Sequence, residues 1–439
     1  MKINFLAAKE VLRALKYRNY RLFFIGQGIS LIGTWMQQIA LGWLVYKLTD
    51  SAFLLGLVSF SSQIPTFILA LFAGLLADRY SKHKIIIITQ SLAMLQAFIL
   101  AILTLTNTVN IWYIITLSVF LGLINAFDMP TRQSFAIELV DDKKDLPNAI
   151  ALNSSAFNAA RLIGPTIAGI LITTLGEGIC FLINAISYIA VIFALLRMKI
   201  QSVQNEVKSE KVMQGLKEGI KYAYNFIPIR ILLLLVAIVS LTGMPYTVLM
   251  PVFARDILHG DSSTLGYLFG AVGIGAFTGA IYLASRKTVL GLGRWIAAAT
   301  SIFSMGLLLF SFSRNIYFSL FLMLFTGFGM MMQMASTNTL LQTLVDNNKR
   351  GRVMSLYVMA FMGTAPIGSL MAGTLASTIG APLTVLSSGI ICLAAAFWFM
   401  KQLPNLRKVI RPIYIQMGIL PEVSQGLQSV THLNMPPNK

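Results

Sequence analysis

The segment Gly74–Lys84, GLLADRYSKHK, places an aspartate, an arginine, two lysines and a histidine between two long apolar runs. Each run supplies the roughly 20 apolar residues that a helix needs to cross a hydrocarbon core about 30 Å thick. The segment is therefore expected to be a short polar loop between two membrane-spanning helices. Basic residues alone are enough to keep such a loop at the membrane surface, so membrane orientation does not explain the presence of the aspartate.

The composition of the whole chain is that of an integral membrane protein. It is 56% hydrophobic and 11% charged, whereas soluble globular domains carry about 25% charged residues. Runs such as residues 85–106 do not alternate between apolar and polar positions, which favours helices over a closed β-barrel. The two cysteines, Cys180 and Cys392, lie in apolar runs, so we expect both to be free thiols.

About twelve runs are long enough to span a membrane. The sequence predicts an all-α integral membrane fold with twelve transmembrane helices in two pseudo-symmetric six-helix bundles. The expected parts are a basic arm (1–21), an N-terminal bundle (22–197), a linker (198–228), a C-terminal bundle (229–401) and a tail (402–439). The predicted spans are 22–47, 52–77, 85–106, 111–135, 148–174, 179–197, 229–253, 264–285, 294–312, 316–343, 353–378 and 381–401.

An internal repeat supports the division into two halves. Leu139-Val140-Asp141, followed by a polar stretch and a glycine-bearing helix, recurs in the second half as Leu344-Val345-Asp346. The linker between the halves contains VMQGLKEGIKYAY (212–224), which we expect to form a short amphipathic helix on the membrane surface. Repeated halves joined by such a linker are typical of transporters that work by alternating access.

The distribution of lysine and arginine predicts the orientation. With the N-terminus inside, only Lys47, Arg255 and Arg314 of the 34 basic residues fall outside, and about 30 lie in the arm, the inner loops, the linker and the tail. Both termini are therefore expected to be cytoplasmic. The net charge of +18 is spread over all the inner loops, which favours contact with anionic membrane lipid over nucleic-acid binding.

Gly74–Lys84 resembles the signature of the major facilitator superfamily between helices 2 and 3, with Ser81 where the family prefers glycine. The stretches FDMPTRQSF (127–135), LPNAIALNSS (146–155) and RLIGPTIAG (161–169) resemble its branch of enterobactin-type siderophore exporters. The resemblance implies that Gly74, Asp78 and Arg79 form a conformational latch near helix 11. The cations alone could equally be topology anchors.

Small residues repeat every four positions on the fifth and eleventh predicted helices, which lets neighbouring backbones approach closely. Gly164, Pro165 and Gly169 also resemble the exporter motif of helix 5, which implies a gate. Gly368 and Gly373 belong to the corresponding region of helix 11. An ordinary packing role remains open for all five.

Two charged residues are predicted to lie within the membrane. An unpaired cation near the bilayer centre costs several kcal/mol, so Arg161 must face a watered cavity or a partner, either as an anchor for an anionic substrate or in a structural pair. Asp128 is the acidic residue placed clearly within a span and is the candidate proton carrier; a structural ion pair or a helix-end contact is the alternative. The two residues lie on consecutive helices, but their estimated depths differ.

Other polar residues near mid-span are weaker candidates for the wall of a substrate cavity, with helix–helix hydrogen bonding as the alternative. They are Gln37, Gln38, Asn125, Asn158, Tyr246, Gln333 and Asn338. The methionine-rich stretch at 329–336 could add a soft apolar wall.

The sequence indicates neither catalysis nor a cofactor. The three histidines are scattered, no Cys/His pair has metal-ligand spacing and no nucleotide-binding motif is present. We therefore expect a monomeric, proton-coupled secondary transporter of the bacterial inner membrane that exports a siderophore or similar polar small molecule. Efflux of hydrophobic drugs is the alternative, followed by a membrane enzyme and a non-transporting sensor.

Overall fold

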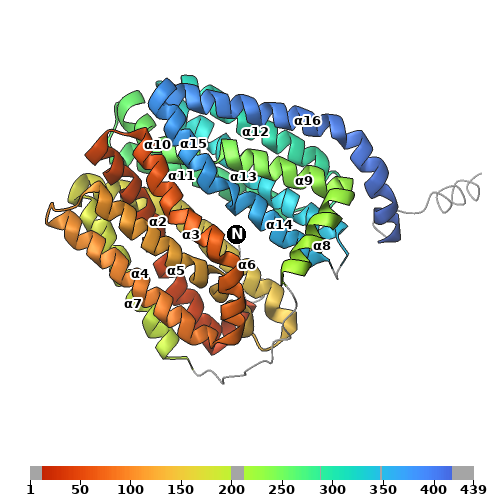
Figure 1. The fold of residues 1–439 in the computed structure, drawn as a ribbon, viewed down its shortest axis with the longest axis horizontal. Helices are drawn as coiled ribbons and strands as arrows, with labels where there is room; N and C mark the ends of the chain where they lie inside the picture. Colours follow the sequence, from red (N-terminus) through yellow and green to blue (C-terminus); the bar gives the residue numbers. More distant parts are fainter. Residues whose placement is uncertain (1–11, 199–211, 287, 347–348, 418–439) are drawn as a thin grey trace, which may run out of the picture.

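The computed structural model describes residues 12–198, 212–286, 288–346 and 349–417. In the described part the chain is helical throughout, apart from short loops, and forms two groups of membrane helices (Figure 1). The N-terminal group contains α2 (Arg18–Thr49), α3 (Ala52–Arg79), α4 (Lys82–Leu105), α5 (Ile111–Glu138), α6 (Leu146–Leu175) and α7 (Glu177–Leu196).

The C-terminal group follows a short helix, α8 (Val212–Asn225), which confirms the predicted helix of the linker. Its first span is divided into α9 (Ile227–Ile238), η3 (Val239–Gly243), α10 (Tyr246–Val252) and η4 (Phe253–Ile257), in which η3 and η4 are π-helical. The remaining spans are α11 (Ser262–Ala284), α12 (Leu292–Phe312), α13 (Ile316–Leu344), the pair α14 (Arg350–Met362) and α15 (Thr364–Ile379), and α16 (Ala381–Gln416).

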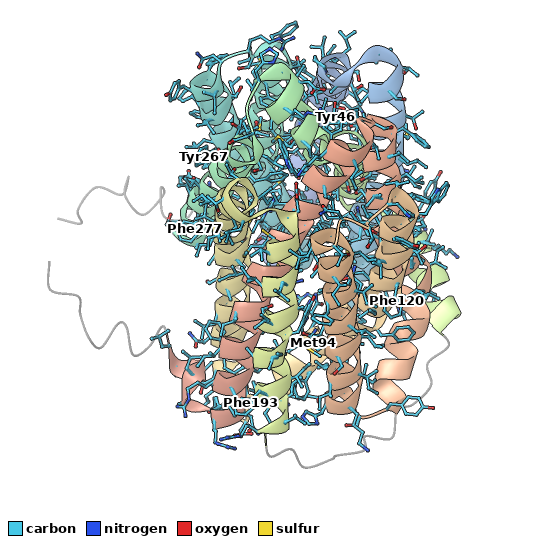
Figure 2. All side chains as sticks on the ribbon, turned by 90° about the vertical axis from the view of Figure 1, so that its left-hand side faces the viewer. Tyr46, Met94, Phe120, Phe193, Tyr267 and Phe277 are labelled. Carbon is cyan, nitrogen blue, oxygen red and sulfur yellow. The ribbon has the colours of Figure 1, made fainter. Side chains whose placement is uncertain are left out.

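Eleven helical segments of the described residues are long and apolar enough to cross a membrane. The twelfth span is α2, whose 32 residues include the polar side chains of Gln27, Gln37 and Gln38. The fold is therefore the predicted one of twelve transmembrane helices in two six-helix bundles. Exposed aromatic side chains such as Phe193 and Tyr267 point outward from the bundles, as Figure 2 shows.

Local sequence explains where several helices begin and break. Asn110, Asp261 and Asn315 accept hydrogen bonds from the first free backbone N–H groups of α5, α11 and α13, which is how short polar side chains cap helices. The eleventh span breaks after Met362 because Pro366, four residues on, has no N–H to offer its carbonyl and its ring crowds that carbonyl.

The last helix is longer than predicted. The sequence analysis ended it at residue 401, whereas α16 continues to Gln416. Its extension buries Leu406, Ile410 and Tyr414, which are spaced four residues apart and therefore share one helix face. Both cysteines are free and buried, as predicted.

The two bundles meet through four helices that form two similar pairs. In one pair α3 packs against α15, and in the other α6 packs against α11. The first helix of each bundle also takes part, because α2 contacts α10. Figure 1 shows the two groups coming together near α10 and lying further apart near α8. We call the end that carries Asp50 and Asp256 the closed end, and the opposite end, where α8 lies, the linker end.

Candidate functional site

Charged and aromatic side chains join the two bundles at the closed end. Tyr46 of α2 donates a hydrogen bond to the carboxylate of Asp256 in η4, and Asp50 pairs with Arg255. The Arg255 guanidinium also lies 5.5 Å from the centre of the Tyr46 ring, within the range of a cation–π interaction. The end of the first span is thereby tied to the end of the seventh, and Tyr46 is seen at this end of the molecule in Figure 2.

Glycines bring the backbones of the two bundles into direct contact near the same end. A Cβ atom on Gly169 of α6 would lie 2.9 Å from the Cα of Gly266 in α11. A Cβ on Gly373 of α15 would likewise lie 2.9 Å from the Cα of Gly56 in α3. Carbon atoms normally approach to about 3.5–4.0 Å, so neither contact leaves room for a side chain. The two contacts occupy corresponding positions in the two helix pairs.

Two hydrogen bonds accompany these glycine contacts. The hydroxyls of Ser59 and Ser369 are 3.2 Å apart, and those of Thr173 and Ser262 are 2.8 Å apart. At the linker end, in contrast, α14 packs against α9 and α13 of its own bundle and against the linker helix α8. The structure is therefore a state in which the bundles are held together at the closed end.

The predicted gate residues divide into two groups. Gly169 and Gly373 face the opposite bundle, and the carbonyl of Pro165 approaches Gly266. Gly164 instead packs against α2, and Gly368 packs against Leu241 of η3, each within its own bundle.

Arg161 lies on α6 beside residues of three other helices. Its guanidinium Nη2 is 3.5 Å from the sulfur of Met330 on α13, and its Cζ is 5.8 Å from the ring centre of Trp35 on α2. It is also close enough to Tyr246 of α10 to interact electrostatically. Trp35 packs edge-on against Phe157 at 5.7 Å. Within the described residues, no carboxylate lies within ion-pairing distance of Arg161.

Among the described residues of the C-terminal bundle, five buried polar atoms lack hydrogen-bond partners: Nε of Arg286, Nε of Arg350 and three others that matter here. These three are the hydroxyl of Tyr246, the amide nitrogen of Gln333 and the hydroxyl of Ser336. Gln333 lies about one helical turn from Met330, which Arg161 contacts. A buried polar atom without a partner costs about 1–3 kcal/mol. A bound molecule that offered oxygen acceptors could recover that cost at Tyr246 and Gln333 and neutralise Arg161.

The other cavity candidates are placed differently. Gln37 lies in a buried amide network, in which Gln96 of α4 accepts from its nitrogen at 3.0 Å and Asn184 of α7 donates to its oxygen at 2.7 Å. This network lies inside the N-terminal bundle. The remaining four candidates, all partly buried or exposed, are Gln38, Asn125, Asn158 and Asn338. Asn158 donates a hydrogen bond to the carbonyl of Ser154, and Asn338 accepts one from Gln342.

Asp128 is 3% exposed and fully engaged within the N-terminal bundle. One carboxylate oxygen accepts from the Thr89 hydroxyl at 2.9 Å and from the Gln90 amide at 2.8 Å, and the other lies 3.2 Å from Nε of Arg132. Arg161 is not among these partners, so the structure separates the two intramembrane charges. The sequence analysis missed Thr89 and Gln90, whose signal was a polar pair directly after four isoleucines.

The latch candidates fall where the structure gives only the backbone. The helix α3 continues through Gly74 and Asp78 to Arg79, but the side chains of these residues lie outside the described part. The latch therefore stays a prediction.

A further polar cluster was not predicted and lies at the linker end. Asp145, at the start of α6, pairs with Arg13 and Lys16 and accepts a hydrogen bond from Tyr17 at 2.8 Å. The hydrogen bond to Asp145 raises the pKa of Lys16 above its ordinary value. Asn148 accepts from the backbone N–H of Ala14. The segment before α2 is thus fastened to the start of the fifth span.

Residues 11–411 match the protein family described as transmembrane secretion effector. The chain belongs to this family of the major facilitator superfamily. It is 29% identical over 394 residues to the staphyloferrin A transporter of Staphylococcus aureus, an alignment that covers 88% of this chain and 97% of that protein. It is 25% identical over 399 residues to the multidrug efflux pump Tap of Mycolicibacterium fortuitum, with coverages of 88% and 95%.

Solved structures of major facilitator transporters share the fold. A bacterial homologue of the human lysosomal transporter Spinster, in an inward-facing and unoccupied conformation, superposes with a TM-score of 0.69 at 12% identity, covering 89% of this chain and 98% of that one. The nucleoside transporter NupG superposes with a TM-score of 0.67 at 14% identity, with coverages of 89% and 99%. The chain is thus a multi-pass membrane protein with the major facilitator fold.

Proposed function

We propose that this transporter exports a polar, anionic small molecule of the siderophore class by alternating access, driven by protons. The observation that carries the proposal is Arg161, a cation within a membrane span that contacts Met330 and Trp35 and has no carboxylate partner among the described residues. A cation placed in this way is best explained by a charge that arrives with the cargo. The similarity to the staphyloferrin A transporter supports the same cargo class.

Residues from both bundles would hold the cargo. Arg161 and Trp35 belong to the N-terminal bundle, whereas Tyr246 and Gln333 belong to the C-terminal bundle. Guanidinium, phenol and amide N–H groups are hydrogen-bond donors, so they suit a carboxylate with further oxygen acceptors nearby. A cargo that contacts both bundles can bias their relative position, as alternating access requires.

The proposed setting is the inner membrane of a bacterium, with a monomer whose linker end and both termini face the cytoplasm. The excess of basic residues in the loops at the linker end supports this orientation. The described state, closed at the opposite end, would then accept cargo from the cytoplasm. The bundles would comprise residues 22–197 and 229–401 as transport units, and no enzymatic step is proposed.

Mass spectrometry of spent medium tests the function directly. Cells that lack the gene should lose one anionic, iron-chelating metabolite from the medium, and cells complemented with the intact chain should regain it. Unchanged metabolites in the deletion strain would contradict the proposal.

The role of Arg161 is tested by substitution. Arg161→Ala should abolish cargo binding, whereas Arg161→Lys should retain part of it, because lysine keeps the charge but loses the two-pronged donor geometry of guanidinium. Binding is measured by titration of cargo into purified protein. Arg132→Lys, which alters a cation already paired with Asp128, is the matched control. Unchanged binding in Arg161→Ala would refute the anchor.

Efflux of hydrophobic drugs is the second candidate. Trp35 and Met330 lie beside Arg161, and Phe157 packs against Trp35, which gives an aromatic and thioether surface that is adaptable and apolar. Similarity to Tap and to the macrolide efflux protein A of Streptococcus pyogenes, 23% identical over 400 residues, points the same way. Accumulation of dye in the deletion strain, with unchanged secreted metabolites, would favour this function.

A further inference from the structure

The linker helix α8 carries two different surfaces. Ile220 and Tyr224 lie one turn apart and are both exposed, 51% and 67% respectively, and Ile227 at the start of α9 is exposed as well. Arg230 stacks on the Tyr224 ring at 5.3 Å and donates to its carbonyl. Exposed apolar side chains with an arginine beside them are typical of a helix in the interface between lipid and water.

The other surface of α8 borders a cavity of about 280 Å³ at the start of α14. Lysine, arginine, tyrosine and asparagine side chains dominate its wall, which includes Lys221, Tyr222, Asn225, Lys349 and Arg352, together with Glu218. Arg352 pairs with Glu218 at 2.5 Å. Lys349 lies 4.4 Å from the centre of the Tyr222 ring.

The charges around this cavity leave an excess of positive charge. Three cations line it against the single carboxylate of Glu218, and the neighbouring Asp346 lies 3.9 Å from the ammonium of Lys349 while remaining 68% exposed. Lys221 is exposed on α8. A small, basic cavity with hydroxyl and amide groups in its wall has the chemistry to hold a phosphate group.

We propose that this cavity binds the headgroup of an anionic phospholipid. The phosphate would contact Lys221, Lys349 and Arg352, and the acyl chains would lie along Ile220 and Tyr224. The location favours lipid over a soluble phosphate, because the same short helix supplies both the basic wall and the exposed apolar surface.

Such a lipid would connect two parts of the molecule. The cavity lies between α8, in the linker, and α14, the linker-end half of the eleventh span. That span reaches the opposite bundle through α15. A bound headgroup would therefore hold α14 against the linker, and this role does not depend on the identity of the cargo.

Native mass spectrometry of the purified full chain, titrated with lipid, tests the proposal. Phosphatidylglycerol should bind more tightly than phosphatidylcholine, and inorganic phosphate should bind weakly and fail to displace the lipid. The double variant Lys221→Gln/Lys349→Gln should lose about thirtyfold in affinity for phosphatidylglycerol, since each lysine near a membrane surface contributes about fivefold. Lys408→Gln, which removes an exposed lysine of α16 that does not line the cavity, should bind as the unmodified protein does.

Equal affinity for phosphatidylglycerol in the double variant and the unmodified protein would overturn the proposal. Displacement of the lipid by inorganic phosphate at similar concentration would overturn the assignment to lipid and leave a soluble anion as the ligand. If the double variant does not purify as a monodisperse protein, the affinity of the single variant Lys221→Gln for phosphatidylglycerol is measured instead. The side chain of Lys221 is exposed, so its substitution should leave the fold intact. A fivefold loss in that variant supports the proposal, and an unchanged affinity contradicts it.

Discussion

Adding one methyl group at Gly169 should push the two bundles apart at the closed end. The Cβ of Gly169→Ala would lie 2.9 Å from the Cα of Gly266 and 2.9 Å from the carbonyl oxygen of Ser262. Both of these atoms belong to the backbone of α11, which cannot turn away as a flexible side chain would. The clash can be relieved only if α6 and α11 separate.

The size of the effect follows from the contact distances. Ordinary carbon contacts need about 3.5–4.0 Å, so the two helices would have to separate by roughly 0.6–1 Å at this point. Overpacking of this kind costs about 1–3 kcal/mol. Because RT is about 0.6 kcal/mol, the ratio of the closed-end state to the opposite state should fall by roughly fivefold to 150-fold. A state in which the bundles are apart at this end would separate the two glycines and relieve the clash.

Pulsed electron resonance between two spin labels measures this shift. Cysteines replacing Trp112 and Tyr317, which are 73% and 79% exposed at the closed end of the two bundles, would carry the labels without disturbing packing. Gly169→Ala should increase the population of longer distances. Gly28→Ala is the control, because a Cβ at Gly28 would meet no atom within 4 Å. Identical distance distributions for both variants and the unmodified protein would refute the reasoning.

Three further predictions concern acidic residues. Asp78→Asn should insert normally but export more slowly, and normal export at matched expression would contradict the latch. Asp128→Asn in proteoliposomes should exchange cargo down its gradient yet fail to accumulate it against one when a pH gradient is imposed; full accumulation would remove Asp128 from coupling. Asp261→Ala should destabilise the protein by about 1 kcal/mol in thermal unfolding. Hydrogen bonds from Ser263 and the Thr264 backbone hold the pKa of Asp261 below its ordinary value. The stability that Asp261 contributes is therefore fully present when the pH is above the ordinary pKa, and it is lost as the pH falls through the lowered pKa of the folded protein. An unchanged unfolding midpoint of Asp261→Ala at neutral pH would contradict this prediction.

The membrane fold follows from the sequence because it depends on length and polarity, which a single chain displays directly. Each apolar run had to become a helix in order to satisfy its own backbone in lipid. The end of α16 could not be predicted in this way. Lys401, Arg407 and Lys408 marked the end of the apolar run, but Leu406 and Ile410 continue the buried helical face beyond it. The hydropathy of a sequence indicates where the membrane-spanning part of a helix ends, whereas the length of the helix depends also on how it packs against its neighbours.

The candidate site was predictable one residue at a time but not as an assembly. Arg161 stood out because a charge is rare in an apolar run, and the structure places it next to Tyr246, which was also a candidate. Trp35 was missed, since an aromatic residue in a membrane helix carries no signal about which way it faces. Gln37 was a candidate on polarity alone, and the structure places it in a network with Gln96 and Asn184. The facing of each helix depends on contacts between helices that are remote in sequence.

The closed end sets an energetic requirement for transport. To open it, the protein must break the contacts of Tyr46 with Asp256 and of Asp50 with Arg255, and must separate the glycine pairs. Any ligand can drive that change only by as much as it binds the open state more tightly than the closed one.

The two intramembrane charges are suited to different parts of this task. Arg161 lies between the bundles, where a bound anion would contact both of them. Asp128 lies inside one bundle, held by Thr89, Gln90 and Arg132. Protonation of Asp128 would weaken the hydrogen bonds that it accepts from Thr89 and Gln90, which join α4 to α5, and its pairing with Arg132 within α5, without competing directly with the cargo. Coupling between proton and cargo would then have to pass through movement of the N-terminal bundle, because the structure shows no contact between Asp128 and Arg161 within the described residues.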